Sequence, residues 1–231
     1  MSRDTASQVQ PWLYWLLWPL HRLLLFIYFS NIKIIGREHL LSQGACILAP
    51  KHCSRWDPVI LALLRPSPLR FMTNANQFSG IQGWFIRRLG AFAVNLSRPQ
   101  PSCLRHCQEL LASGQTLVLF PEGGIQPDRL RPLKSGLARI ALQAEALTHQ
   151  PIPIIPIALG YAPAPKFRAQ VCIYICPPLF TTDAVESIRP SDSELENMPE
   201  PRAIAQAMTQ QLQQSLEVGL AQINTLINSI E

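Results

Sequence analysis

The stretch Ala49-Pro-Lys-His-Cys-Ser-Arg-Trp-Asp-Pro58 joins two segments with different secondary-structure patterns. The apolar run at 45–50 is typical of a β-strand, and the segment at 56–65 contains Asp-Pro, which is typical of the start of a helix. His52 therefore leaves the end of a strand, while Asp57 opens the following helix. We expect this short turn to bring the carboxylate to the imidazole.

A histidine paired with a carboxylate is suited to proton transfer. An aspartate that accepts a hydrogen bond from Nδ1–H fixes the ring tautomer, leaves Nε2 free as a base and stabilises the imidazolium. The neighbouring Cys53 and Ser54 are interpreted as turn residues, and the nucleophile would then be a hydroxyl of the substrate. Taken alone, the pattern leaves two other interpretations open. Asp57 could only complement the helix dipole, and His52 could be a histidine at a strand end with a purely structural hydrogen bond.

A second motif follows a predicted strand at 116–120, where the chain reads Phe120-Pro121-Glu122-Gly123-Gly124. The proline fixes a turn, the glutamate offers a carboxylate, and the two glycines let backbone N–H groups approach a ligand closely. A run of basic residues comes next in the sequence, namely Arg129, Arg131 and Lys134. A further block, between the two motifs, runs from Gly90 to Arg98.

Strand and helix patterns alternate along residues 31–180. Further strands are predicted at 31–36, 69–73, 91–96, 152–160 and 170–176, and further helices at 82–89, 101–113 and 132–148. This alternation predicts an α/β fold with a mixed, largely parallel sheet flanked by helices. The run at 152–160 contains two prolines, which predict an edge strand or the start of one.

Residues 1–30 are predicted to form an apolar, membrane-associating helical segment. The run at 11–29 is close to the thickness of a bilayer core, but Pro19 interrupts it and Arg22 would lie near the bilayer centre. We therefore expect two short apolar pieces hinged at Pro19, with tryptophans anchored in the headgroup layer. Two alternatives stay open: a full span of the bilayer, and a helix that packs on the protein's own core.

Residues 181–231 differ from the rest of the chain in charge and pattern. The segment at 181–200 is acidic and polar, and we interpret it as a linker. Apolar residues then recur at steps of three and four from Ile204 to Ile230, which predicts an amphipathic helix. This helix is expected to pack back on the domain, and an interface with a partner is the alternative.

The composition of the 231-residue chain excludes several classes of protein. Apolar residues make up 48%, which excludes disorder throughout the chain. Residues 1–180 hold 18 of the 20 Lys and Arg but 7 of the 15 Asp and Glu, which indicates an anionic surface or a phosphorylated ligand, or else ordinary solvated charge. No recognisable module interleaves the bases with aromatic residues, so nucleic acid is not expected as a partner. The six cysteines lack zinc-site spacing, so we expect them to be buried and reduced, with no metal.

These blocks, in this order, resemble the glycerolipid acyltransferase family, whose best-known members acylate 1-acylglycerol-3-phosphate. The resemblance covers residues 31–180 and rests on the His-x4-Asp pattern together with Phe-Pro-Glu-Gly. It implies that His52 is the base and that Asp57 orients it. The substrate-binding residues that follow from it are Phe120, Pro121, Glu122, Gly123, Arg98 and Arg131.

The chain departs from the family pattern at three places. Lys51 replaces the asparagine that precedes the histidine, and Gly124-Ile125-Gln126 replaces the Thr-Arg-Ser that follows Phe-Pro-Glu-Gly. The arginine expected to meet the phosphate of the acceptor is therefore missing, and Arg129 or Arg131 is the candidate to replace it. Arg98, in the position of the arginine of the second block, comes slightly late.

The resemblance implies an acyltransferase that moves a fatty acyl group from a thioester to the hydroxyl of a lysolipid, with 1-acylglycerol-3-phosphate favoured. The co-substrate would be acyl-CoA or acyl-carrier protein, no cofactor is implied, and the enzyme would work at the cytoplasmic face of a membrane in phospholipid synthesis. Two alternatives stay open: the same chemistry on a lysophospholipid, a glycosylated lipid or a pigment, and lipid binding without turnover. The predicted division is a membrane-associating segment at 1–30, an acyltransferase domain at 31–180, and a linker with a C-terminal helix at 181–231.

Overall fold

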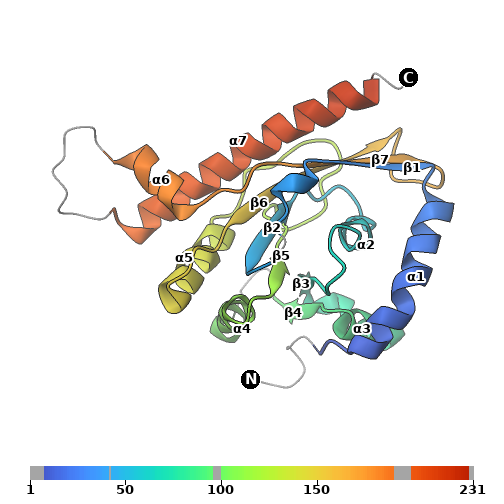
Figure 1. The fold of residues 1–231 in the computed structure, drawn as a ribbon, viewed down its shortest axis with the longest axis horizontal. Coiled ribbons are helices and arrows are strands. Elements are labelled where there is room, and N and C mark those ends of the chain that lie inside the picture. Colours follow the sequence, from blue (N-terminus) through green and yellow to red (C-terminus); the bar gives the residue numbers. More distant parts are fainter. Residues whose placement is uncertain (1–7, 42, 96–99, 190–198, 229–231) are drawn as a thin grey trace.

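A seven-stranded sheet in the order β1-β7-β6-β2-β5-β3-β4 runs through the centre of the protein (Figure 1). The computed structural model describes residues 8–41, 43–95, 100–189 and 199–228. The strands are β1 (Asn31–Ile35), β2 (Cys46–Pro50), β3 (Arg70–Asn74), β4 (Phe92–Val94), β5 (Thr116–Val118), β6 (Ile154–Ala162) and β7 (Gln170–Ile175). Among these described strands all neighbours pair in parallel except β6 and β7, so the predicted mixed, largely parallel sheet is confirmed.

Helices cover both faces of this sheet. They are α1 (Pro11–Tyr28), α2 (Asp57–Leu61), α3 (Gly80–Arg88), α4 (Pro101–Ala112), α5 (Gly136–Thr148), α6 (Thr181–Ile188) and α7 (Pro201–Asn228), with short 3-10 turns η1 (Arg37–His39) and η2 (Ala75–Gln77). Figure 1 shows α4, α5 and α7 on one side of the sheet and α1 and α2 on the other.

The side chains of β2 show how the sheet divides the core. Ile47 and Ala49 pack in a cluster with residues of α4, α5 and α7. Cys46 and Leu48 pack in a second cluster with residues of α1 and α2. Successive residues of a strand point to opposite faces, and here both faces are covered. This is why β2 is a continuous apolar run in which all five residues are buried.

The prediction that residues 152–160 form an edge strand is wrong, because β6 lies between β2 and β7. Pro156 is tolerated there because it serves only as an acceptor: its carbonyl receives the N–H of Cys176 at 2.9 Å. The ladder with β7 begins one residue later, at Ile157, where a donor is available again. A proline at the start of a ladder therefore does not require an edge position.

The expected hinge at Pro19 is also absent, since α1 is one helix with Pro19 inside it. A proline within a helix removes a hydrogen bond at a cost of ~3 kcal/mol. Packing on the domain offsets this cost: Leu25 and Phe29 belong to the core cluster on the α2 side of the sheet. In addition, Nε2 of His21 lies 2.7 Å from the carbonyl oxygen of Val59.

The opposite face of α1 is exposed and apolar. Its exposed large side chains are Trp12, Trp15, Leu16, Leu20, Leu23, Leu24, Phe26 and Ile27. Phe26 keeps 80% of its surface in contact with solvent, which is unusual for so large an apolar side chain. Within the described part of the chain, no helix combines the length and apolar character needed to cross a membrane.

The described C-terminal residues contribute two helices. The segment expected to be a linker begins with α6, where the backbone N–H of Phe180 donates to Oδ2 of Asp183 at 3.2 Å, and residues 190–198 lie outside the described part. α7 packs back on the domain as expected, with Met208 and Leu216 in the core. Gly219 permits a close approach to the sheet, because a Cβ there would lie 2.9 Å from that of Ala158.

Candidate active site

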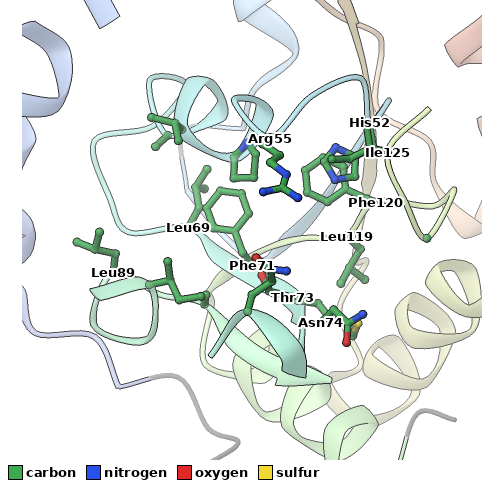
Figure 2. A pocket seen from close by; sticks show the side chains of 18 of the residues that line it. His52, Arg55, Leu69, Phe71, Thr73, Asn74, Leu89, Leu119, Phe120 and Ile125 are labelled. Carbon is green, nitrogen blue, oxygen red and sulfur yellow. The ribbon is translucent and has the colours of Figure 1, made fainter. Parts of the chain in front are cut away.

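The two sequence motifs meet because their strands are neighbours in the sheet. β2 and β5 pair in parallel, and ligand sites in such sheets form where the carboxyl ends of the strands meet. His52 follows β2 and Phe120 follows β5, so both side chains emerge at this edge. Their rings stack with centroids 3.9 Å apart and planes at 23°, and Figure 2 shows them side by side.

His52 and Asp57 form the hydrogen bond that their spacing predicts. Nδ1 of His52 lies 2.8 Å from Oδ2 of Asp57, whose side chain is fully buried at the start of α2. Because a carboxylate only accepts hydrogen bonds, Nδ1 carries the proton in the neutral ring and Nε2 is unprotonated. The side chain of His52 is 15% exposed and lines a cavity, so Nε2 is available to a bound molecule.

Three further hydrogen bonds hold the Asp57 carboxylate. Oδ2 accepts the backbone N–H groups of Cys53 at 2.6 Å and Ser54 at 2.8 Å. Oδ1 accepts the hydroxyl of Tyr161 at 2.5 Å. Burial, together with the charge of Asp57, raises the pKa of Tyr161, so the hydroxyl stays protonated and remains a donor. The carboxylate therefore organises the turn and orients His52 at the same time.

Tyr161 is a site residue that sequence reasoning missed. It lies in β6, which pairs in parallel with β2, so it reaches the same carboxyl edge from a strand far away in the sequence. The prolines of this segment predict an edge strand, and nothing in the pattern then places Tyr161 beside Asp57. A central position of β6, beside β2, is the feature that would have predicted the contact of Tyr161 with Asp57.

Glu122, in the second motif, is linked to the first motif by buried contacts. Both of its carboxylate oxygens lie 3.1 Å from Nζ of Lys51, and the two side chains are 0% and 2% exposed. Oε1 also accepts the N–H of His52, and Oε2 accepts that of Arg131, each at 3.1 Å. Lys51 donates to the carbonyl of Gln126, whose own N–H binds the carbonyl of His52 at 2.7 Å. Lys51, which stands where the family pattern has an asparagine, thus forms a buried ion pair with Glu122.

The structure separates the predicted substrate-binding residues. Phe120, Pro121 and Gly123 line the cavity beside His52, whereas Glu122 does not. Arg131 is exposed and, among the described residues, is not part of the cavity lining. Arg98 lies outside the described residues, so its prediction has no counterpart here. The contacts of Glu122 suit it to fixing the backbone of His52, and those of the other three residues suit them to meeting a ligand.

The cavity beside His52 has a volume of about 800 Å³. This is within the range of ~300–1,000 Å³ that is typical of ligand pockets. Its walls come from the helices α1 to α5, from β3 and from the segment after β5, as Figure 2 shows in part. Away from His52 the lining is largely apolar and includes Leu69, Phe71, Ile86, Leu104 and Ile140. Such a cavity suits a long apolar chain with a polar end at the histidine.

Cys53 and Ser54 have the structural positions expected of turn residues. Both are buried, and the thiol of Cys53 donates to the carbonyl of Leu159 at 3.2 Å. Burial, with a contribution from the charge of Asp57, raises the pKa of Cys53 to about 12, so the thiol is not ionised near neutral pH. All six cysteines are buried and free, as expected. In the described residues, no cluster of three or more His, Cys, Asp or Glu is arranged to hold a metal ion.

Comparisons with known proteins agree with this geometry. Residues 31–160, more than half of the chain, match the model of the Acyltransferase family. A 1-acyl-sn-glycerol-3-phosphate acyltransferase of Streptococcus pneumoniae is 33% identical over 102 residues, which are 43% of this chain and 38% of that protein. A chloroplastic protein of the same activity from Brassica napus is 31% identical over 136 residues, 57% of this chain and 38% of that one.

Two bacterial proteins complete the comparison. The 1-acyl-sn-glycerol-3-phosphate acyltransferase of Bacillus subtilis is 26% identical over 131 residues, 56% of this chain and 62% of that protein. The chain thus spans between 38% and 62% of the length of these relatives. The crystal structure of the 1-acyl-sn-glycerophosphate acyltransferase PlsC of Thermotoga maritima aligns with a TM-score of 0.60 at 19% identity, covering 90% of this chain and 80% of that one. At this identity the alignment shows a shared fold.

Proposed function

The chain belongs to the acyltransferase family, and from this premise we propose that it transfers a fatty acyl group from a thioester to a lysolipid hydroxyl. The acceptor that we favour is 1-acylglycerol-3-phosphate, because the relatives named above carry that activity in their names. The observation that carries the proposal is the bond between His52 and Asp57 at the wall of a large apolar cavity. The reaction would serve phospholipid synthesis.

The proposed chemistry needs one base and no covalent enzyme intermediate. Nε2 of His52 takes the proton from the acceptor hydroxyl as its oxygen attacks the thioester carbonyl carbon. The tetrahedral intermediate collapses, the carbon–sulfur bond breaks, and the imidazolium returns its proton to the departing thiolate. Asp57 stabilises the positive ring between these two steps. A positioned base of this kind contributes ~10²–10⁴-fold in rate.

The donor is proposed to be acyl-CoA or acyl-carrier protein. Either one presents its acyl chain through a thioester, and the apolar part of the cavity offers walls for that chain at Leu104, Leu119 and Ile140. The stacked ring of Phe120 limits the freedom of His52, which favours a single orientation of the base. Both features support direct transfer within one cavity.

We further propose that the exposed face of α1 rests on the cytoplasmic surface of a membrane. Its apolar side chains would otherwise remain in water, and amphipathic helices of this kind bury such a face at the lipid interface. Residues of the same helix, namely Tyr14, Leu17, Trp18 and His21, line the cavity. A lysolipid leaving the membrane at α1 would therefore enter the site directly.

A second acceptor class has one observation in its favour. Gly124, Ile125 and Gln126 stand where the family resemblance leads us to expect an arginine for the acceptor's phosphate, and none of them carries a positive charge. A neutral acceptor, such as a monoacylglycerol or a glycosylated lipid, needs no such charge. The same base and cavity would serve that reaction.

The experiment that tests the proposal is a product analysis with purified protein. We would incubate it with labelled acyl-CoA or acyl-carrier protein and a panel of lysolipids, and then separate the labelled lipids. We expect a labelled diacyl product that forms from at least one donor and is greatest with 1-acylglycerol-3-phosphate. The absence of acyl transfer to every acceptor, with protein that is folded, would overturn the proposal.

A further inference from the structure

The charges on the cavity wall are all of one sign. Among the described residues that line it, Arg55 and Lys134 are the permanently charged ones, and no aspartate or glutamate is present. A cavity with cations and no carboxylate has a positive potential that low-dielectric walls strengthen. The lining therefore selects for an anionic group in a bound ligand.

Arg55 is placed next to the base. It lies in the turn between His52 and Asp57, and Figure 2 shows its side chain extending into the cavity on the same side as the rings of His52 and Phe120. Within the described part of the chain, its guanidinium has no hydrogen bond or ion pair. A free guanidinium beside the reacting hydroxyl is suited to bidentate recognition of a phosphate.

Lys134 approaches the same cavity from the loop that precedes α5. Its backbone N–H donates to the carbonyl of Pro121 at 3.0 Å, which ties this loop to the second motif. Its ammonium lies over Gly123, since a Cβ built on that glycine would be 2.7 Å from Nζ. Gly123 has φ of 72°, so a glycine suits both the backbone and the space. Like Arg55, Lys134 has no ion-pair partner in the described residues.

The first turn of α5 adds to this potential. Gly136, its first residue, also lines the cavity, and the N-terminal end of a helix carries a partial positive charge. A Cβ at Gly136 would meet no atom within 4 Å, so the backbone there is open to the cavity. This contribution supplements that of the two side chains.

We propose that Arg55 and Lys134 bind the phosphate of the acceptor, an inference that rests on the proposed acyl transfer. In a lysophosphatidate the phosphate is only a few covalent bonds from the hydroxyl that reacts at His52. In acyl-CoA or acyl-carrier protein, the whole pantetheine arm separates the thioester from the nearest phosphate. A cation three residues from the base therefore matches the acceptor rather than the donor. These two residues take the place of the missing arginine.

The test compares acceptors with and without a phosphate. Arg55→Gln and Lys134→Gln would be assayed with 1-acylglycerol-3-phosphate and with a 1-monoacylglycerol, at saturating donor. Each variant is expected to raise KM for the phosphorylated acceptor about tenfold or more, because a charge-assisted contact is lost. The matched controls are Arg37→Gln and Lys166→Gln, which remove exposed charges away from the cavity. They should leave both acceptors unchanged.

The donor is tested in the same variants. If Arg55 or Lys134 bound the donor instead, its substitution would raise the KM for acyl-CoA or acyl-carrier protein with both acceptors. That result, or equal damage to the phosphorylated and the neutral acceptor, would overturn the assignment. Unchanged KM for the phosphorylated acceptor in the Arg55→Gln/Lys134→Gln double variant would overturn it as well.

A binding measurement separates this inference from the proposed reaction. A 2-deoxy analogue of 1-acylglycerol-3-phosphate keeps the phosphate but cannot accept an acyl group, so its affinity reports recognition alone. We expect calorimetry in neutral detergent to show binding to the wild type that weakens at least tenfold in the double variant. If this difference in affinity is found but the wild-type protein transfers no acyl group, the proposed reaction is refuted and the phosphate site stands. Equal affinity in both proteins would refute the site.

Discussion

Replacement of Lys51 by methionine tests the buried ion pair beneath the active site. The substitution keeps an unbranched side chain that is one atom shorter and removes the charge, which leaves the carboxylate of Glu122 buried without its ammonium partner. Breaking a buried pair in this way costs ~3–5 kcal/mol. For a chain of this size each kcal/mol lowers the melting temperature by roughly 2–4 °C, so Lys51→Met should lower it by roughly 6–20 °C.

The structure also predicts the outcome of removing both charges. In Lys51→Met/Glu122→Gln no charge is left buried, and the glutamine oxygen can still accept the N–H of His52 or of Arg131. The double variant should therefore lose less stability than Lys51→Met alone, which a double-mutant cycle detects as a coupling energy.

Thermal and denaturant unfolding of the purified variants would supply the measurement. The control is Lys166→Met, an exposed lysine whose replacement should change the free energy of unfolding by no more than ~0.5 kcal/mol. A loss below ~1 kcal/mol in Lys51→Met would refute the reasoning, since an ion pair that matters so little is not acting as a buried one.

Three more predictions concern the base, a thiol and the membrane. Tyr161→Phe removes one of the hydrogen bonds that hold the Asp57 carboxylate, so kcat/KM should fall about tenfold while the KM for the acceptor stays close to that of the wild type. An unchanged kcat/KM would argue against a positioning role. The pKa of Cys53 is raised from 9.0 to about 12, so its stabilising contribution is complete below pH 9 and is lost as pH rises toward 12. Urea unfolding of Cys53→Ala should show a smaller fall in stability over that interval than the wild type, and equal slopes would contradict this. The double variant Trp15→Ser/Phe26→Ser should weaken sedimentation with phospholipid vesicles by ~10-fold or more. The control Leu147→Ser, which changes another exposed apolar residue on α5, should sediment like the wild type. Equal sedimentation of the wild type, the double variant and Leu147→Ser would argue against the α1 interface.

Local patterns predicted the parts of the protein that depend on neighbours in sequence. The contact of His52 with Asp57 follows from a histidine just after a strand end and a helix start five residues further on, and both features are visible in the residue types. The parallel sheet follows from the alternation of strands and helices. Phe120 and Gly123 meet the cavity because any loop at the carboxyl end of β5 must open there.

Contacts between distant segments could not be predicted in this way. The pairing of Lys51 with Glu122 and that of Asp57 with Tyr161 depend on which strands are neighbours, and the order of strands is not written in local patterns. The prolines of β6 and α1 were misleading for a related reason. Each removes one backbone donor, but packing against the rest of the domain decides whether that loss breaks the element, as Pro156 and Pro19 show.

The turnover of the His52→Ala variant in acyl transfer tests the role of the proposed base most directly. The substitution removes the imidazole, and a melting temperature close to that of the wild type would show that the fold is retained. With the acyl donor that supports the wild type and with 1-acylglycerol-3-phosphate as acceptor, turnover should fall by ~10²-fold or more. A folded His52→Ala variant that keeps more than about a tenth of wild-type turnover would contradict the assignment of His52 as the base.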